Sequence, residues 1–87
     1  MFQLTILTLD KVVFSEQIQY LIAPGELGYL EILPHHAALM TTLKKGQLEI
    51  KNKDSVKIHY VVSTGLLEVY QNEARLFADS IELNSLS

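Results

Sequence analysis

The adjacent histidines His35 and His36 are the residues whose type and spacing could bind a metal ion or transfer a proton. They follow Pro34 in the segment LPHHAALM, and the only other histidine of the chain is His59. Neighbouring side chains of an extended segment point to opposite faces, so His35 and His36 cannot easily share one ion. A zinc site needs three or four protein ligands, and the chain contains no cysteine to complete one. We therefore expect neither a metal site nor a cofactor.

The other reactive side chains form no recognisable catalytic motif. Ser63, Thr64 and Gly65 follow an apolar run, but they do not match G-x-S-x-G and no helix follows them, so a turn is the favoured interpretation. The carboxylates are scattered along the chain, and Gly25 and Gly28 are too few to cradle a phosphate. The sequence predicts a protein without an active site of its own. A metal-dependent enzyme remains a third hypothesis that depends on the two histidines alone.

The elements that position these residues are predicted to be strands. Apolar residues recur at every second position of several segments, for example Ile18, Tyr20 and Ile22 on one face of QIQYLI, and strand-forming residue types crowd these segments. Turn signals separate them at short intervals, as in a β-sandwich. We predict one all-β domain over residues 1–87, a small antiparallel β-sandwich of about ten short strands whose tail frays from about residue 81. The predicted strands include FQLTIL (2–7), QIQYLI (17–22), HAALMTTL (36–43), QLEIK (47–51), VKIHYV (56–61), LLEVY (66–70) and ARLFA (74–78).

Composition excludes several classes of protein. The net charge is −3 and the lysines form no cluster free of acids, so nucleic-acid binding is not expected. No run approaches the ~20 apolar residues of a membrane span, so direct membrane insertion is not expected. The N-terminal segment MFQLTILTLD lacks the basic start and the cleavage site of a secretory signal. We expect a soluble domain of intracellular type that attaches to a membrane assembly, if at all, through a partner.

The apolar pattern near the N-terminus leaves two interpretations open. Leu7, Leu9 and Val13 are out of phase with the face formed by Leu4 and Ile6. A β-bulge with burial on both sides would explain them. An exposed apolar patch, which is typical of a permanent partner site, would explain them equally well.

An ordered series of short motifs runs through the chain and carries a resemblance. The motifs are VFS, APGE, G-x-L-x-ILP-x-HA-x-L, L-K-x-G, S-x-G-x-LEV and L-x-AD, in this order between Val13 and Asp79. From Leu4 to about Ser80, the chain resembles the N-terminal β-sandwich domain of the ε subunit of F-type ATP synthases. The series as a whole is more specific than any single motif.

The resemblance implies a non-catalytic subunit of the central stalk, or rotor. Such a subunit couples the γ subunit to the ring of c subunits during proton-driven ATP synthesis. It is peripheral, on the cytoplasmic face of the bacterial inner membrane, as part of the synthase. The resemblance implies contact with γ at Thr8, His36 and Met40, and contact with the c ring at Gly28, Tyr29, Glu31 and Leu39.

Several positions depart from the family pattern. His35 replaces a glycine, so the histidine pair reflects this substitution rather than a ligand pair. Tyr29 stands where the family often has an acidic residue, and Glu31 stands where it usually has glycine. Bacterial and chloroplast relatives continue into a C-terminal helical hairpin that can inhibit ATP hydrolysis and in some members binds ATP. Since this chain stops eight residues after Asp79, we expect no inhibitory helices. The alternative is a free-standing β-sandwich module that binds a small ligand or a peptide.

Overall fold

The computed structural model describes residues 1–84, and these residues form nine β-strands and no helix. The predicted all-β sandwich is confirmed, with nine strands in place of about ten. None of the described residues forms a helix of the length and apolarity that crossing a membrane requires. The strands are β1 (Phe2–Leu7), β2 (Val12–Gly25), β3 (Gly28–Ile32), β4 (Leu39–Leu43), β5 (Gly46–Asn52), β6 (Lys57–Val62), β7 (Gly65–Tyr70), β8 (Glu73–Ala78) and β9 (Ile81–Leu83).

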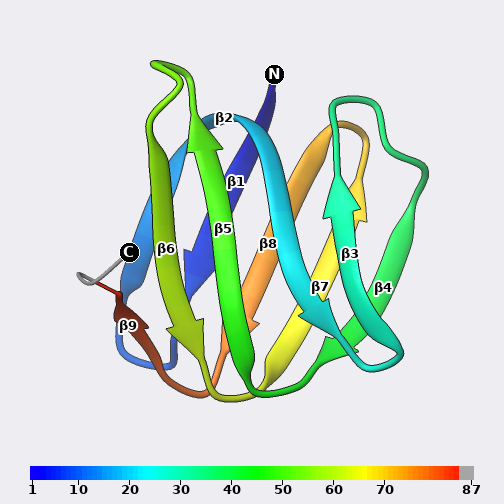
Figure 1. Cartoon of the computed structure of the whole chain (residues 1–87). Helices are drawn as coiled ribbons and strands as arrows, with labels where there is room; N and C mark the ends of the chain where they lie inside the picture. The colour runs from blue at the N-terminus through cyan, green and yellow to red at the C-terminus, as the bar shows by residue number, and fades with distance from the viewer. Residues whose placement is uncertain (85–87) are drawn as a thin grey trace.

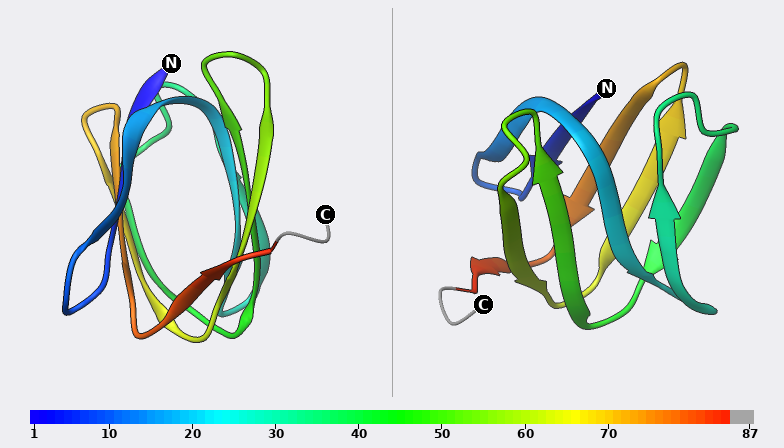
Figure 2. Two further views of the ribbon diagram at one scale, coloured as in Figure 1. Left: turned by 90° about the vertical axis from the view of Figure 1, so that its left-hand side faces the viewer. Right: turned by 45° about the horizontal axis from the view of Figure 1, so that its top comes forward.

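The strands pack as two layers, which the edge-on view of Figure 2 separates clearly. One layer contains β1, β8, β7 and β4, and the other contains β3, β5, β6 and β9. The long strand β2 belongs to both layers, because it pairs with β1 along its first half and with β3 and β5 along its second half. The β1–β2 loop and the β2–β3 turn lie at one end of the sandwich, and the β3–β4 loop lies at the other end (Figure 1).

The space between the layers is filled by aliphatic and aromatic side chains. Regular alternation in β1 buries Phe2, Leu4 and Ile6, as the sequence predicts, and Leu48 and Ile50 of β5 face them from the other layer. No polar or charged side chain is buried among the described residues. The fold is therefore stabilised by an entirely apolar core, and every polar group that could act on a partner lies at the surface.

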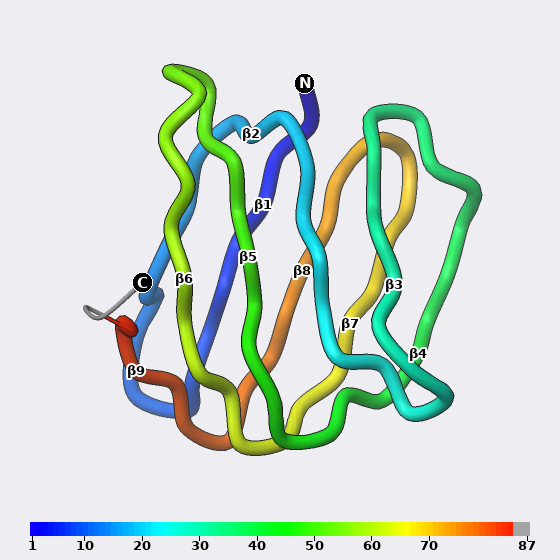
Figure 3. The backbone as a smooth tube through the Cα atoms, viewed as in Figure 1, coloured from blue at the N-terminus to red at the C-terminus, as the bar shows by residue number. Residues whose placement is uncertain are grey.

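A β-bulge in β2 corrects the predicted face of the QIQYLI segment. Ile18 pairs with Asn52 and Tyr20 pairs with Lys51, so Gln19 is an extra residue on β2. Beyond the bulge Leu21 and Ala23 are buried, whereas Tyr20 and Ile22, which the sequence places on the face of Ile18, are only half-buried. The tube drawing shows β2 curving from one layer to the other through this region (Figure 3).

A second β-bulge explains why Val13 is out of phase with the face formed by Leu4 and Ile6. Ile6 pairs with Phe14 but Leu7 pairs with Val12, so Val13 is extra and packs against the core. Leu9, in the loop that follows β1, is 101% exposed. Both interpretations of the sequence pattern therefore hold, the bulge for Val13 and the exposed apolar residue for Leu9.

Two features of the sheet differ from the predicted arrangement. The pair formed by β1 and β8 is parallel, whereas the other strand pairs are antiparallel. The tail does not fray from residue 81, because Ile81–Leu83 form β9 and pair with Tyr60–Val62 of β6. The predicted fraying of the last residues, 85–87, lies outside the described part of the chain.

Candidate interaction surfaces

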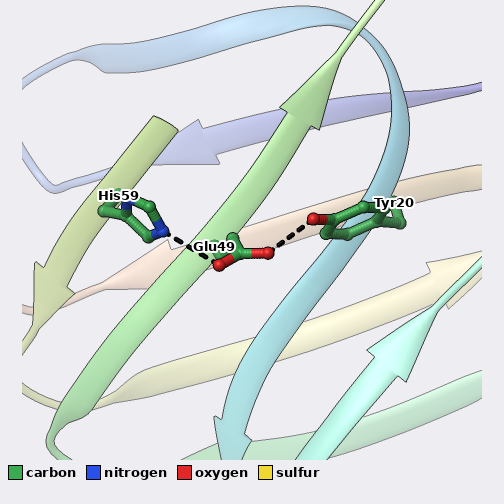
Figure 4. A network of polar contacts seen from close by, with 3 residues as sticks. All are labelled: Tyr20, Glu49 and His59. Atoms are coloured by element: carbon green, nitrogen blue, oxygen red, sulfur yellow. Dashed lines mark hydrogen bonds and ion pairs between the residues drawn. The ribbon is translucent and has the colours of Figure 1, made fainter. Parts of the chain in front are cut away.

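A polar network lies on the outer face of the layer that contains β5. Tyr20 Oη donates a hydrogen bond to Glu49 Oε2 at 2.5 Å, and His59 Nε2 donates to Glu49 Oε1 at 2.9 Å. The three side chains come from the neighbouring strands β2, β5 and β6, with Glu49 between the other two (Figure 4). Glu49 and His59 are also a direct cross-strand pair. The bulge at Gln19 is what brings Tyr20 to this outer face.

The network shifts the protonation equilibria of two of its members. The hydrogen bond from Tyr20, followed by that from His59, lowers the pKa of the Glu49 carboxyl below its ordinary value of 4.5. The hydrogen bond to Glu49, together with burial, raises the pKa of Tyr20 to about 12. Both shifts favour a Glu49 carboxylate that accepts from a neutral tyrosine. The arrangement ties three strands together and contains no activated nucleophile.

The histidine pair of the sequence lies away from this network. His35 and His36 are in the β3–β4 loop, so the extended-chain argument that separates their side chains does not apply there. His35 has a left-handed backbone with φ of 65°, and its N–H donates to Asn72 Oδ1 at 2.8 Å. His36 Nδ1 donates to the Ala37 carbonyl at 2.7 Å. Residues 1–84 contain no group of three or more His, Cys, Asp or Glu side chains placed to hold a metal ion.

An apolar row crosses the outer face of the other layer. Leu7 of β1 is in register with Phe77 of β8, Phe77 with Leu66 of β7, and Leu66 with Thr42 of β4. The next row on the same face is polar at Thr5, Arg75 and Glu68 and ends at the apolar Met40. Phe77 points outward and is 42% exposed, whereas Leu76 and Ala78 on either side of it point inward and are buried. The apolar row is therefore a surface feature and no part of the core.

The apolar row lines a shallow open groove. Its lining includes Thr8 and Leu9 of the β1–β2 loop. It also includes Thr64 and Asp79, where the Thr64 hydroxyl donates to the Asp79 carboxylate. We call this surface the β8 face. It consists of Leu7, Thr8, Leu9, Thr42, Leu43, Thr64, Gly65, Leu66, Phe77, Ala78 and Asp79.

The residues expected to contact γ divide between two places. Thr8 lines the β8 face, and Met40, which is 64% exposed, lies in the polar row beside it. His36 lies in the β3–β4 loop at the opposite end of the sandwich from Thr8 (Figure 1). Sequence reasoning missed Leu66 and Phe77. Leu66 shares a strand face with Glu68, and Phe77 shares one with Arg75, so alternation could have placed both outward. That they lie side by side follows only from the register between β7 and β8.

The residues expected to contact the c ring are also divided. Gly28, Tyr29 and Glu31 are exposed on β3, which belongs to the layer opposite the β8 face. Leu39 does not join them: it pairs with buried Val69 and packs against the core near the start of β4. Its alternation with Met40 explains this, since one of the two must face inward. Contact of the half-buried Leu39 with the ring stays a prediction.

Comparison with known proteins identifies the domain. Residues 1–84 match the family model described as the ATP synthase, Delta/Epsilon chain, beta-sandwich domain. A protein named ATP synthase epsilon chain from Protochlamydia amoebophila is 43% identical over 82 residues, which are 94% of this chain and 56% of that protein. Another of the same name from Dehalococcoides mccartyi is 44% identical over 80 residues, covering 92% of this chain and 56% of that protein. The chain thus spans about half the length of these curated relatives.

Solved structures share the fold. A chain of the Euglena gracilis mitochondrial ATP synthase, solved as OSCP/F1/c-ring, superposes with a TM-score of 0.87 at 21% identity over 92% of this chain and 51% of that one. A chain of the Tetrahymena thermophila mitochondrial ATP synthase, solved as central stalk and c-ring, gives 0.79 at 18% identity over 92% and 64%. The family model covers nearly the whole chain, and the chain therefore belongs to the ATP synthase delta/epsilon family, with residues 1–84 as its beta-sandwich domain.

Proposed function

We propose that this chain is a non-catalytic subunit of the central stalk of an F-type ATP synthase, where it couples the γ subunit to the c ring. Its membership of the family supports this proposal, as do relatives that carry the name ATP synthase epsilon chain. The subunit works peripherally at an energy-transducing membrane, on the cytoplasmic face in a bacterium. It needs no cofactor and no active site of its own.

The observation that carries the proposal is the apolar row of the β8 face. Leu7, Leu66 and Phe77 cover three neighbouring strands on a face whose next row contains Arg75 and Glu68. An apolar strip of this kind, bordered by polar side chains, is the usual anatomy of a protein interface. We assign the β8 face, with Thr8 within it and Met40 at its margin, to the γ subunit. His36, the third residue predicted to contact γ, lies at the other end of the sandwich, away from Thr8.

The exposed residues Gly28 and Tyr29 supply the second surface. They lie on β3 in the layer opposite the β8 face, beside the two-residue turn 26–27 at one end of the sandwich. Glu31, which the resemblance also predicts to contact the ring, is exposed further along the same strand. A subunit that couples γ to the ring needs two surfaces that point in different directions. We assign the β2–β3 hairpin to the ring.

Reconstitution tests the proposal. The chain is added to ATP synthase depleted of its own ε subunit, and ATP-driven ion pumping into vesicles is measured. We expect restored pumping and, by calorimetry, a dissociation constant for γ of about 1 μM or tighter, as for an interface of standard size. A chain that binds neither γ nor the depleted complex, but binds a small ligand or a peptide, would favour the free-standing binding module instead.

A further inference from the structure

The β2–β3 hairpin exposes two large side chains at its tip, one aliphatic and one aromatic. Leu27 is 103% exposed in the turn between Gly25 and Gly28, so it contributes nothing to the core. Tyr29, one ladder step beyond the Gly25–Gly28 pair, is 63% exposed. A single exposed leucine is ordinary on a protein surface, but an exposed leucine beside an exposed aromatic residue is a candidate contact point.

Tyr29 is held in place before any partner arrives. The Gln47 N–H donates a hydrogen bond to Tyr29 Oη at 3.2 Å, so the side chain extends from β3 across β2 to β5. Its ladder partner Pro24 is fully buried. A Cβ at Gly46 would lie 3.0 Å from Tyr29 Oη and 2.8 Å from Pro24 Cβ, so glycine at position 46 makes room for this arrangement. A side chain fixed in this way loses little conformational entropy when a partner packs on it.

The charges at this end of the sandwich balance. Its loops, residues 8–11, 26–27, 44–45, 63–64 and 79–80, carry three acidic and three basic side chains: Asp10, Glu26, Asp79, Lys11, Lys44 and Lys45. Glu26, the acid nearest to Leu27, accepts a hydrogen bond from Thr42 Oγ1 at 3.0 Å and is directed toward β4. The end therefore offers no excess of either charge for steering or pairing.

Glu31 lies outside the tip. It pairs with Ile22, three ladder steps from the Gly25–Gly28 end, which is about 10 Å along the strand. The same row continues to Glu49 and His59, so Glu31 belongs to the middle of the outer face.

On the basis of the proposed function, we infer that the hairpin docks on the c ring through Leu27 and Tyr29, which pack against an uncharged surface of the ring's loops, and that Glu31 forms no ion pair there. Contact of this kind depends little on ionic strength, because no charges have to approach one another.

The test compares the affinity of the full chain for isolated γ with its affinity for a γ–c ring complex. The increase in affinity from isolated γ to the γ–c ring complex measures the contribution of the ring contact alone. Leu27→Ser and Tyr29→Ser should each reduce this increase about tenfold. The matched control Leu33→Ser, a 49% exposed leucine at the other end of β3, and the charge control Glu31→Gln should each leave it within about twofold. Raising KCl from about 50 to about 500 mM should change it less than about threefold.

Each other outcome has a distinct meaning. Wild-type chain that binds neither γ nor the complex would overturn the proposed function and this inference together. An increase that survives Leu27→Ser and Tyr29→Ser but falls with Glu31→Gln or with salt would overturn the inference alone. A concentration-dependent dimer of the chain that Leu27→Ser abolishes would overturn it as well, because the tip would then bind a second copy. Unchanged urea midpoints of the variants show that each loss is one of docking and not of folding.

Discussion

At the scale of single residues, Glu49 is the centre of the polar chemistry on this domain. Its carboxylate accepts from Tyr20 and from His59, and all three side chains lie on the outer face of one layer. Hydrogen bonds to an ionised acceptor are stronger than those between neutral groups, and they favour the charged form. The network therefore stabilises the association of β2, β5 and β6 only while Glu49 is ionised and Tyr20 is neutral.

The pH dependence of stability follows from the directions of these pKa shifts. The pKa of Glu49 is lowered in the folded state, so its contribution is complete above its ordinary value of 4.5 and is lost as the pH falls through the lowered pKa. The pKa of Tyr20 is raised from 10.0 to about 12, so its contribution is complete below pH 10.0 and is lost as the pH rises toward 12. Glu49→Gln should lower the free energy of unfolding at neutral pH by about 0.5–1 kcal/mol, since the pair is at a solvated surface.

Urea unfolding between about pH 3 and pH 7 measures this effect. The acid-induced loss of stability should be smaller in Glu49→Gln than in wild type. Glu73→Gln is the control, because Glu73 is an exposed carboxylate whose nearest cation, Arg75, is 4.0 Å away. Equal losses in the two variants, or an unchanged acid dependence in Glu49→Gln, would contradict the role given to the network.

His35 permits a second prediction at this scale. Its φ of 65° is in the left-handed region, which costs an L-residue about 1–2 kcal/mol, whereas glycine adopts it freely. After the entropy cost of glycine, His35→Gly should raise the free energy of unfolding by about 0.5–1 kcal/mol. His36→Gly should lower it, because the backbone of His36 is not left-handed and the variant loses the hydrogen bond from Nδ1 to the Ala37 carbonyl. If both variants lose stability equally in urea, position 35 has no backbone strain that glycine relieves.

At the scale of elements, the bulge in β2 decides which residues form the core and which form the surface. Gln19 is the extra residue, and its Nε2 donates to the Asn52 carbonyl at 3.0 Å and to Ser55 Oγ at 2.9 Å. The side chain thus fastens the bulge to the β5–β6 turn. If Gln19 were paired in a regular ladder and were not an extra residue, Leu21 and Ala23 would turn outward, since one residue reverses every later side chain of a strand.

Two variants of this site test what the bulge residue contributes. Gln19→Ala removes both hydrogen bonds and should cost about 1–2 kcal/mol of unfolding free energy in urea. Deletion of Gln19 leaves Ile18 opposite Asn52 and Tyr20 opposite Lys51, so Leu21 and Ala23 stay inward and the domain should still fold, which circular dichroism would show. Gln17→Ala, which removes only an exposed bond to Gln3, should stay within about 0.5 kcal/mol. A deletion variant that fails to fold would show that β2 needs the bulge itself to pass from one layer to the other.

The same bulge marks how far the sequence predicts the structure. Strict alternation in FQLTIL predicts the buried face of β1 correctly, because polar residues separate the apolar ones. In the segment Leu21-Ile22-Ala23 all three residues are apolar, so periodicity cannot show that the phase has changed. Leu39 next to Met40 presents the same ambiguity. To predict the Tyr20–Glu49–His59 network or the apolar row, one must know the register between neighbouring strands. The sequence of a single strand does not reveal that register.

At the scale of the whole molecule, the domain has two separate surfaces. The β8 face covers the outside of one layer, whereas the β2–β3 hairpin projects from one end of the other layer (Figures 1 and 2). The apolar core between them is continuous and has no buried polar group among the described residues. Under the proposed function, a force applied at one surface would be transmitted through this interior to the other surface.

The most direct test of this account is calorimetric titration of γ with two matched charge variants. Phe77→Glu alters the β8 face, and Val61→Glu alters the outer face of the opposite layer; the two wild-type residues are 42% and 40% exposed. An unpaired charge in a packed interface costs several kcal/mol, so Phe77→Glu should weaken γ binding about 100-fold or more, while Val61→Glu stays within about threefold. Equal effects of the two variants, or a larger effect of Val61→Glu, would contradict the assignment of the β8 face to γ.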